Sequence, residues 1–175
     1  MSPNILSYLK HGVRPHMQRI SKIAEIGALN VNGSAKQILH RYVEEGSTWV
    51  GIDRVKGKGV DIVANAVEWL ADKQEQFDMV VACECYEHDP KWWLTSEVAK
   101  KAVKKGGLYV VTAPGIAFPF HDFGGDYYRF TEMAFREVVF ENLTVIDVTS
   151  VHGMVGKLAE RPEGVPTVVG FARKS

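Results

Sequence analysis

Two acidic residues and a glycine-containing loop are the part of this sequence best suited to chemistry. Glu25 and Gly27 stand at the end of the first apolar run, and Gly33 follows in the loop after it. A second apolar run, residues 49–52, ends at Asp53. Strand, glycine loop, helix, strand and acid form the βαβ unit that binds a nucleoside: the loop backbone approaches the ligand and the acid accepts both ribose hydroxyls. The sequence therefore predicts a site for a nucleoside-bearing cofactor.

The glycine spacing of this loop differs from that of a dinucleotide-binding protein. The loop reads Glu-x-Gly with a later Gly33, whereas the dinucleotide motif G-x-G-x-x-G brings the backbone close to a pyrophosphate. Because no pyrophosphate has to be held here, the cofactor can carry a cation where a dinucleotide carries phosphates. This favours S-adenosylmethionine.

Five segments, in this order and at these distances, resemble the class I S-adenosylmethionine-dependent methyltransferases, in particular the small type 11 methyltransferase domains. The resemblance extends over about residues 20–150, and its segments are 25–27 with 32–34, 50–53, 77–81 with 87–88, 106–108 with 112–115, and 126–131. It implies an α/β fold, a Rossmann-like three-layer sandwich whose seven-stranded, mostly parallel sheet has its last strand antiparallel. It also implies S-adenosyl-L-methionine as the cofactor.

The elements that position these residues can be read from the spacing of apolar side chains. Apolar residues that recur every three or four positions predict helices, and continuous apolar runs such as 77–83 predict parallel strands covered on both faces. The predicted strands are 22–26, 49–53, 60–66, 77–83, 108–113, 143–149 and 165–173. The predicted helices are a segment after Ser34 that ends at Gly46, then 67–70, 91–105 and 131–140. Strand and helix alternate, which favours helices on both faces of a mainly parallel sheet.

Residues in four places are predicted to bind the cofactor. They are Glu25, Gly27, Ala28 and Leu29 in the first loop, Asp53 and Arg54 after the second strand, Asn65, Ala66 and Val67 after the third, and Cys83 and Glu84 after the fourth. We expect the first loop to hold the methionine end of the cofactor, with help from Glu25 through the loop or a water molecule. Asp53 would accept from the ribose hydroxyls, and the Asn65 amide oxygen would accept from the adenine amino group. Relatives often have a glycine at the position of Leu29. The larger Leu29 side chain narrows the loop.

The candidate catalytic residues are His88, His121, Asp126 and Tyr127. Together with Asp122 and Arg129, they are the polar groups expected to face the methyl acceptor, in part from a long loop at 114–130 that could close over the site. A histidine suits the work of a general base near neutral pH, if the acceptor must lose a proton. The alternative is structural: both histidines make ordinary hydrogen bonds, and the segment 126–130 packs as a lid with Arg129 in an ion pair inside it.

The two cysteines raise the question of a metal. Cys83, Cys85 and His88 have a spacing compatible with zinc, but no fourth ligand is evident, and we assign no metal. Strand alternation predicts that both cysteines lie on one face as buried thiols. No Pro-Cys motif and no Asp/Asn-Pro-Pro-aromatic motif follows the fourth strand, which disfavours modification of DNA bases.

Composition limits the remaining possibilities. The chain has 175 residues, 46% hydrophobic and 24% charged, with a formal net charge of zero, which predicts a single globular domain. With the resemblance, this implies one methyltransferase domain, 1–175, with an N-terminal arm at about 1–20 packed over the cofactor side. Zero net charge gives no reason to expect a nucleic-acid partner, and no apolar run approaches the about 20 residues of a membrane span. No signal peptide is evident, and we expect the cytoplasm.

Three functions stay open from the sequence. The first is transfer of a methyl group from S-adenosylmethionine to an oxygen or nitrogen of a small or carrier-bound acceptor. The second is a non-catalytic binding module or subunit with a methyltransferase fold. The third is a NAD-dependent oxidoreductase, which shares the βαβ unit and Asp53. The acceptor and the oligomeric state cannot be read from the sequence.

Overall fold

A computed structural model describes residues 1–121, 124–153 and 164–175, and this part of the chain contains a seven-stranded sheet in the order β3-β2-β1-β4-β5-β7-β6. The strands are β1 (Lys22–Ile26), β2 (Thr48–Asp53), β3 (Ile62–Val63), β4 (Phe77–Cys83), β5 (Val103–Pro114), β6 (Thr144–Gly153) and β7 (Val165–Arg173). The strands β1 to β5 pair in parallel, whereas β7 is antiparallel to both β5 and β6. This confirms the predicted sheet.

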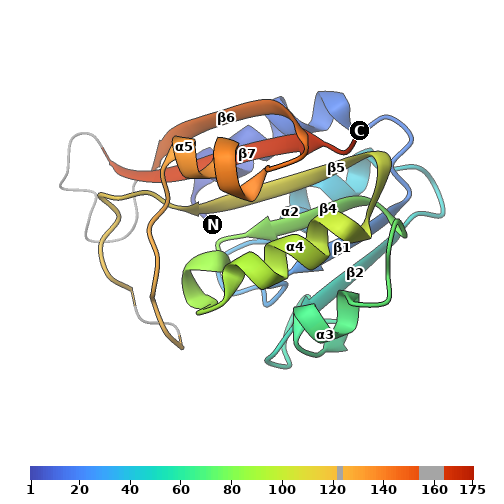
Figure 1. The fold of residues 1–175 in the computed structure, drawn as a ribbon, viewed down its shortest axis with the longest axis horizontal. Helices are drawn as coiled ribbons and strands as arrows, with labels where there is room; N and C mark the ends of the chain where they lie inside the picture. The colour runs from blue at the N-terminus through green and yellow to red at the C-terminus, as the bar shows by residue number, and fades with distance from the viewer. Residues whose placement is uncertain (122–123, 154–163) are drawn as a thin grey trace.

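Helices cover both faces of the sheet, as predicted (Figure 1). One face carries α3 (Ala66–Leu70), α4 (Trp92–Ala102) and α5 (Glu132–Ala134), which continues as η5 (Phe135–Val139). The other carries α1 (Pro3–Tyr8), η1 (Leu9–Val13) and α2 (Ala35–Leu39). The shorter turns are η2 (Arg14–His16), η3 (His40–Tyr42) and η4 (Tyr86–His88). None of the helices in the described ranges is long and apolar enough to cross a membrane.

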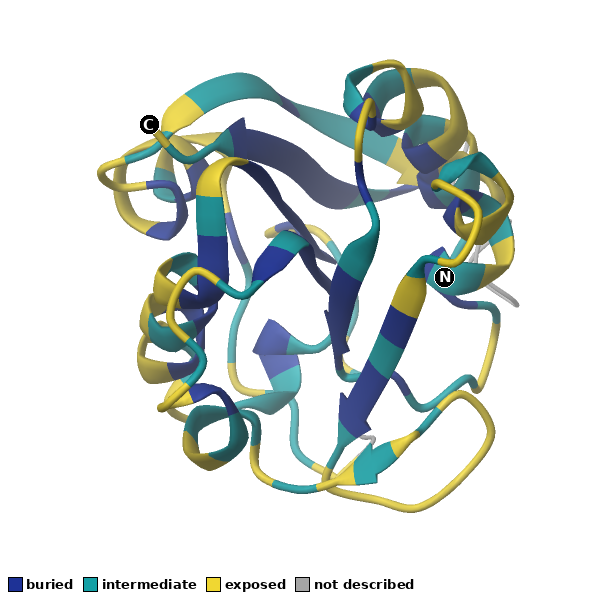
Figure 2. Ribbon diagram, turned by 90° about the vertical axis from the view of Figure 1, so that its right-hand side faces the viewer, coloured by how far each residue is buried: buried dark blue, intermediate teal, exposed yellow. Residues whose placement is uncertain are grey.

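The core consists of two apolar layers separated by the sheet. Along β4, Val80 and Ala82 face the layer under α3 and α4, while Met79 and Val81 face the layer under α1 and α2. All four side chains are fully buried, because a strand in the middle of a parallel sheet is covered from both sides. In Figure 2 the central strands are therefore dark blue, and the outward faces of the helices are yellow.

The third strand is shorter than predicted. We expected residues 60–66, but β3 comprises only Ile62–Val63. Asp61 precedes it and accepts a hydrogen bond from the backbone N–H of Gly51 (2.8 Å), and Asn65 follows as the N-cap of α3. The Asp61 side chain bonds to the backbone of Gly51 in β2, and the Asn65 side chain bonds to Val67 at the start of α3, where the helix takes over from the strand.

The boundary between the fourth helix and the fifth strand also differs from the prediction. The helix predicted to reach residue 105 ends at Ala102, and β5 begins at Val103, which pairs with Phe77. Pairing is then interrupted before Leu108, where a Cβ atom on Gly107 would lie 2.8 Å from the carbonyl oxygen of Asp78. The glycine pair therefore lies inside an irregular strand. Similarly, the helix predicted to end at Gly46 ends earlier, with Tyr42 in η3.

The start of α2 gives a first test of the fold. Ser34 accepts from the backbone N–H of Gln37, and the Gln37 side chain accepts from the backbone N–H of Ser34 in return. We expect Ser34→Ala to lower the free energy of unfolding by about 1 kcal/mol, because it removes an N-cap. Chemical denaturation measures this. Ser7→Ala, at an exposed position within α1, is the control and should change stability by less than about 0.5 kcal/mol. An equal effect of both substitutions would contradict the role of Ser34 as the N-cap of α2.

Candidate active site

A cavity of about 1020 Å³ opens at the carboxyl ends of β1, β2 and β4. The chain proceeds from β1 through β2 to β3 on one side and returns to β4 on the other, and this reversal is where open α/β sheets bind ligands. Each residue predicted to bind the cofactor lines this cavity: Glu25, Gly27, Ala28, Leu29, Asp53, Arg54, Asn65, Ala66, Val67, Cys83 and Glu84. The segment 1–3 also lines it.

The loop after β1 requires a glycine at residue 27. Gly27 has a φ of +69°, and a Cβ atom there would lie 2.5 Å from the Cβ of Cys85. The loop is then held by Asp53: one carboxylate oxygen accepts from the backbone N–H of Leu29 (3.0 Å), and the other accepts from that of Val55 (2.9 Å). Each oxygen keeps a further lone pair for a ligand. Asp53 thus fixes the loop while its carboxylate lines the cavity.

Glu25 organises the elements beneath this loop. Its carboxylate is 4% exposed and accepts from the indole N–H of Trp49 (2.8 Å) and from the backbone N–H of Ala35 at the start of α2 (3.2 Å). Burial raises the pKa of Glu25 to about 7, because the charged form loses its hydration. Glu25 supports the loop from below by joining β1, β2 and α2; its predicted help in holding the cofactor stays a prediction.

This shifted pKa predicts how stability depends on pH. Between about pH 4.5, where Glu25 ionises in the unfolded chain, and about pH 7, where it ionises in the folded protein, only the unfolded state loses this proton. Stability should therefore fall as pH rises through this interval. In Glu25→Gln this contribution disappears, and the difference in unfolding free energy between parent and variant should change with pH in the same interval. Denaturant unfolding at several pH values measures this difference in unfolding free energy. If the difference is the same at every pH, the raised pKa of Glu25 is refuted.

Asn65 has a structural task that the sequence did not reveal. Its side-chain oxygen accepts from the backbone N–H of Val67 (2.9 Å) and caps α3. We predicted that this oxygen accepts from the adenine amino group, so the ligand would have to share it with the cap. Contact between the segment 65–67 and adenine stays a prediction.

The turn after β4 separates the two cysteines. Glu84 has a φ of +50°, and Cys83 packs in one apolar layer while Cys85 packs against the other. The prediction that both lie on one face is therefore wrong, because the strand ends at Cys83. Both thiols are free. Glu84 accepts a hydrogen bond from the Thr112 hydroxyl (2.9 Å), and burial raises its pKa to about 7.

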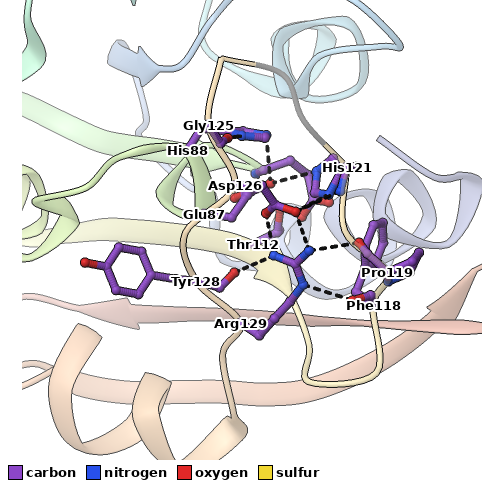
Figure 3. Close-up of polar contacts among 11 residues, drawn as sticks. Glu87, His88, Thr112, Phe118, Pro119, His121, Gly125, Asp126, Tyr128 and Arg129 are labelled. Atoms are coloured by element: carbon purple, nitrogen blue, oxygen red, sulfur yellow. Dashed lines mark hydrogen bonds and ion pairs between the residues drawn. The ribbon is translucent and has the colours of Figure 1, made fainter.

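Arg129 and Asp126 hold the loop that follows β5 (Figure 3). The guanidinium donates to both carboxylate oxygens of Asp126 (2.5 and 2.6 Å) and to the carbonyl oxygens of Phe118, Pro119 and Tyr128. The Asp126 side chain is fully buried, and the hydrogen bonds from Arg129 lower its pKa to about 2. The ion pair within the lid is thus present, as in the structural alternative drawn from the sequence.

Glu87 lies beside the two histidines of the cavity wall. Its side chain is fully buried, and its Oε1 atom lies 3.6 Å from Nε2 of His88 and 3.8 Å from Nε2 of His121. Among the described residues, neither Glu87 oxygen has a hydrogen-bond partner. Burial, followed by the charge of Glu84, raises the pKa of Glu87 well above its usual range. Burial also lowers the pKa of His121, which favours its neutral form.

The predicted catalytic residues therefore occupy three different positions. His88 and His121 line the cavity, together with Glu87. Asp126 lies behind His121, where its Oδ2 atom is 3.4 Å from Nδ1 of the imidazole. The structure does not bring Tyr127 to the cavity: its side chain is 55% exposed, because its backbone N–H turns inward to the carbonyl oxygen of Glu87. Asp122 lies outside the described residues.

Two residues of the site were absent from the predicted set. Glu87 was noticed only as part of a Glu-His pair, and Thr112 only as part of a strand-end segment. An acid beside a histidine after an apolar strand is a usable signal for Glu87. For Thr112 no such signal exists, because its hydroxyl meets Glu84 only through the pairing of β4 with β5.

Comparisons with known structures identify the fold. A methyltransferase of Archaeoglobus fulgidus, described as dependent on S-adenosylmethionine, is similar with a TM-score of 0.69 at 15% identity, over 97% of this chain and 93% of the other. The 1,6-didemethyltoxoflavin-N1-methyltransferase of Burkholderia thailandensis, solved with S-adenosylhomocysteine, is similar with a TM-score of 0.70 at 18% identity, over 97% and 78%. No protein-family model and no curated protein matches the sequence. The fold is that of the class I S-adenosylmethionine-dependent methyltransferases.

Proposed function

We propose that this chain is a single-domain methyltransferase that transfers the methyl group of S-adenosyl-L-methionine to an oxygen or nitrogen atom of a small or carrier-bound acceptor. One observation carries the proposal: the loop after β1, Asp53, the segment 65–67 and the end of β4 line a single cavity at the reversal point of a methyltransferase fold. The Burkholderia thailandensis enzyme of this fold contains bound S-adenosylhomocysteine.

The charges around the cavity support a cationic cofactor over a dinucleotide. A dinucleotide fold places its pyrophosphate at the N-terminus of the helix after β1. Here the carboxylate of Glu25 already accepts from the backbone N–H of Ala35 at the start of α2, and Glu84 is a second acid in the cavity wall. Phosphates would meet these acids at the helix end, whereas a sulfonium and an ammonium group would stabilise the ionised form of each acid. This argues against the NAD-dependent oxidoreductase.

Methyl transfer itself needs little from the protein beyond position. It is an in-line displacement from a sulfonium whose leaving group is neutral, and holding two reactants in line is worth about 7–11 kcal/mol in well-oriented systems. His88 and His121 are the imidazoles in the cavity wall that could take a proton from an acceptor hydroxyl or amine.

Both cysteines are free thiols, as expected in a reducing compartment, and we propose the cytoplasm.

Titration calorimetry tests the cofactor assignment. We expect S-adenosylhomocysteine to bind the full chain with a stoichiometry of one, and NAD to give no heat of binding under the same conditions. Absence of S-adenosylhomocysteine binding would end the methyltransferase proposal, and binding of NAD would favour the oxidoreductase.

A second experiment separates an enzyme from a non-catalytic module. Labelled S-adenosylmethionine is incubated with the protein and a panel of hydroxyl- and amine-bearing acceptors, and labelled products are separated by mass. Turnover of any acceptor supports the enzyme. Firm cofactor binding without any product across the panel would favour the binding module.

A further inference from the structure

Glu87 is a buried acid in a group of side chains that would stabilise a bound cation. Its side chain is fully buried, and both oxygens are without a hydrogen-bond partner among the residues that the structure describes. A buried carboxylate keeps its charge where it is paired with a cation or bound to a metal, and otherwise takes up a proton. Glu84 and Asp126 are two further acids beside it, and Arg129, the cation in this group, already binds Asp126 through both nitrogens. The cluster therefore has more acidic than basic groups.

Two imidazoles complete a ligand set around Glu87. The donor atoms of Glu87, His88 and His121 all lie within 4.8 Å of one another. The two measured separations, 3.6 Å to His88 and 3.8 Å to His121, are close to the about 3.4 Å between neighbouring ligands of a tetrahedral ion with bonds of about 2.1 Å. The donor atoms of the two imidazoles lie within 4.8 Å of each other, so an imidazole would rotate inward for all three atoms to bind one ion.

The groups behind the imidazoles match those found behind metal ligands. Nδ1 of His88 contacts the carbonyl oxygen of Gly125. Because a carbonyl only accepts, Nδ1 carries a hydrogen, and in the neutral imidazole that binds a metal the lone pair is on Nε2, on the Glu87 side. Nδ1 of His121 faces Asp126 at 3.4 Å, and Arg129 fixes that carboxylate (Figure 3). A metal-binding histidine usually donates its other N–H to a backbone carbonyl or a carboxylate. The first arrangement occurs at His88; at His121 the Asp126 carboxylate lies at 3.4 Å from Nδ1 without a hydrogen bond among the described residues.

We propose that Glu87, His88 and His121 form a binding site for one divalent transition-metal ion. Two imidazoles and one carboxylate are a ligand set that binds zinc or ferrous iron and leaves further coordination positions open. All three residues line the cavity, so the open positions face it. Resting on the proposed function, these positions would bind an oxygen atom of the methyl acceptor. The bound ion would then take over from His88 and His121 the task of favouring loss of the acceptor's proton, because the Nε2 lone pairs would be on the metal. From the sequence we considered only Cys83, Cys85 and His88 as ligands and assigned no metal because no fourth ligand was evident; the structure places the two cysteines in different layers.

The test uses the full chain, freed of metal with a chelator and titrated with Co²⁺ alone. Absorption shows whether the ion is bound by nitrogen and oxygen or by thiolate, which adds a sulfur-to-cobalt charge-transfer band, and calorimetry gives affinity and stoichiometry. We expect one ion per chain and no thiolate band. Glu87→Gln and His121→Ala should each weaken binding at least tenfold. His11→Ala, which removes an exposed histidine of η1 away from the cavity, should bind as the parent does.

Several outcomes would overturn the site. They are no binding by the parent, equal affinity of the parent and both cavity variants, or a thiolate band. Circular dichroism and thermal melting confirm that the variants fold, and Glu87→Gln preserves the shape of the side chain. S-adenosylhomocysteine is titrated separately in the presence of chelator. If it binds while Co²⁺ does not, the metal site fails and the proposed function stands; if Co²⁺ binds and S-adenosylhomocysteine does not, only the proposed function fails.

Discussion

Replacement of Asp53 by alanine is expected to weaken S-adenosylhomocysteine binding by about 1.5–3 kcal/mol, the range for hydrogen bonds to a charged group. This corresponds to a loss of roughly 10- to 150-fold in affinity. The variant loses the carboxylate that would accept from the ribose hydroxyls. It also loses the acceptor that holds the backbone N–H of Leu29, so the loop against the ligand becomes less ordered. Both effects act on binding in the same direction.

Calorimetry on the parent, Asp53→Ala and Asp53→Asn measures this effect. The asparagine retains one side-chain oxygen, so its affinity should lie between those of the other two proteins. Asp72→Ala is the matched control, because Asp72 is an exposed acid that pairs only with its neighbour Lys73 in the described structure and does not line the cavity. Fold stability of Asp53→Ala should change by less than about 1 kcal/mol, since the freed N–H groups can bond to water. Unchanged affinity of Asp53→Ala would mean that the cofactor site is elsewhere.

Replacement of Arg129 by alanine is expected to lower the free energy of unfolding by about 3 kcal/mol, the lower end of the range for breaking a buried ion pair. The Asp126 side chain is fully buried, whereas that of Arg129 is 19% exposed, which places the expected loss toward that lower end. The substitution leaves the Asp126 charge without its partner. It also removes the donor to three backbone carbonyl oxygens between Phe118 and Tyr128.

A double variant identifies the cause of this loss. If the unpaired charge of Asp126 causes most of the loss in stability, Asp126→Asn in the Arg129→Ala background should recover more than half of it. If the carbonyl contacts dominate, the double variant should be no more stable than Arg129→Ala. Arg41→Ala removes an exposed arginine with one long contact of 3.5 Å, and it should cost less than about 0.5 kcal/mol. Denaturant unfolding compares the parent and the three variants. If Arg129→Ala loses no more unfolding free energy than Arg41→Ala, Arg129 does not stabilise the loop after β5.

The central strands could be predicted from the sequence because their composition allows few alternatives. The run at 77–83 is almost entirely apolar, and only a strand covered on both faces accommodates such a run. The acid after the second strand was predictable for a related reason: Asp53 comes directly after an apolar run and within the spacing of a βαβ unit. The antiparallel course of β7 has no comparable signal in its residues, and only the resemblance to the methyltransferases implied it.

The remaining parts of the site depend on tertiary contacts. The backbone of Glu84 adopts a positive φ of +50°, which no sequence pattern indicated, and this turn sends Cys85 away from Cys83. The meeting of Glu87 with His121 depends on the path of the loop after β5, which the Arg129–Asp126 pair sets. The sequence offered that pair only as one alternative. Sequence patterns thus predicted the cavity-lining residues after β1, β2 and β3 more fully than those on the side of the loop after β5.

The position of β7 has a consequence for how the protein folds. Although β7 follows β6 along the sequence, it lies between β5 and β6 in the sheet. During synthesis, β5 therefore has no neighbour on this side until residues 165–173 have emerged from the ribosome. The edge of β5 that stays unpaired until then is segment 108–114, which is buried in the folded protein. An apolar unpaired strand edge is a template for association between chains. We expect shortened chains that lack β7 to aggregate, since β6 has no partner that would hold it against the sheet without β7.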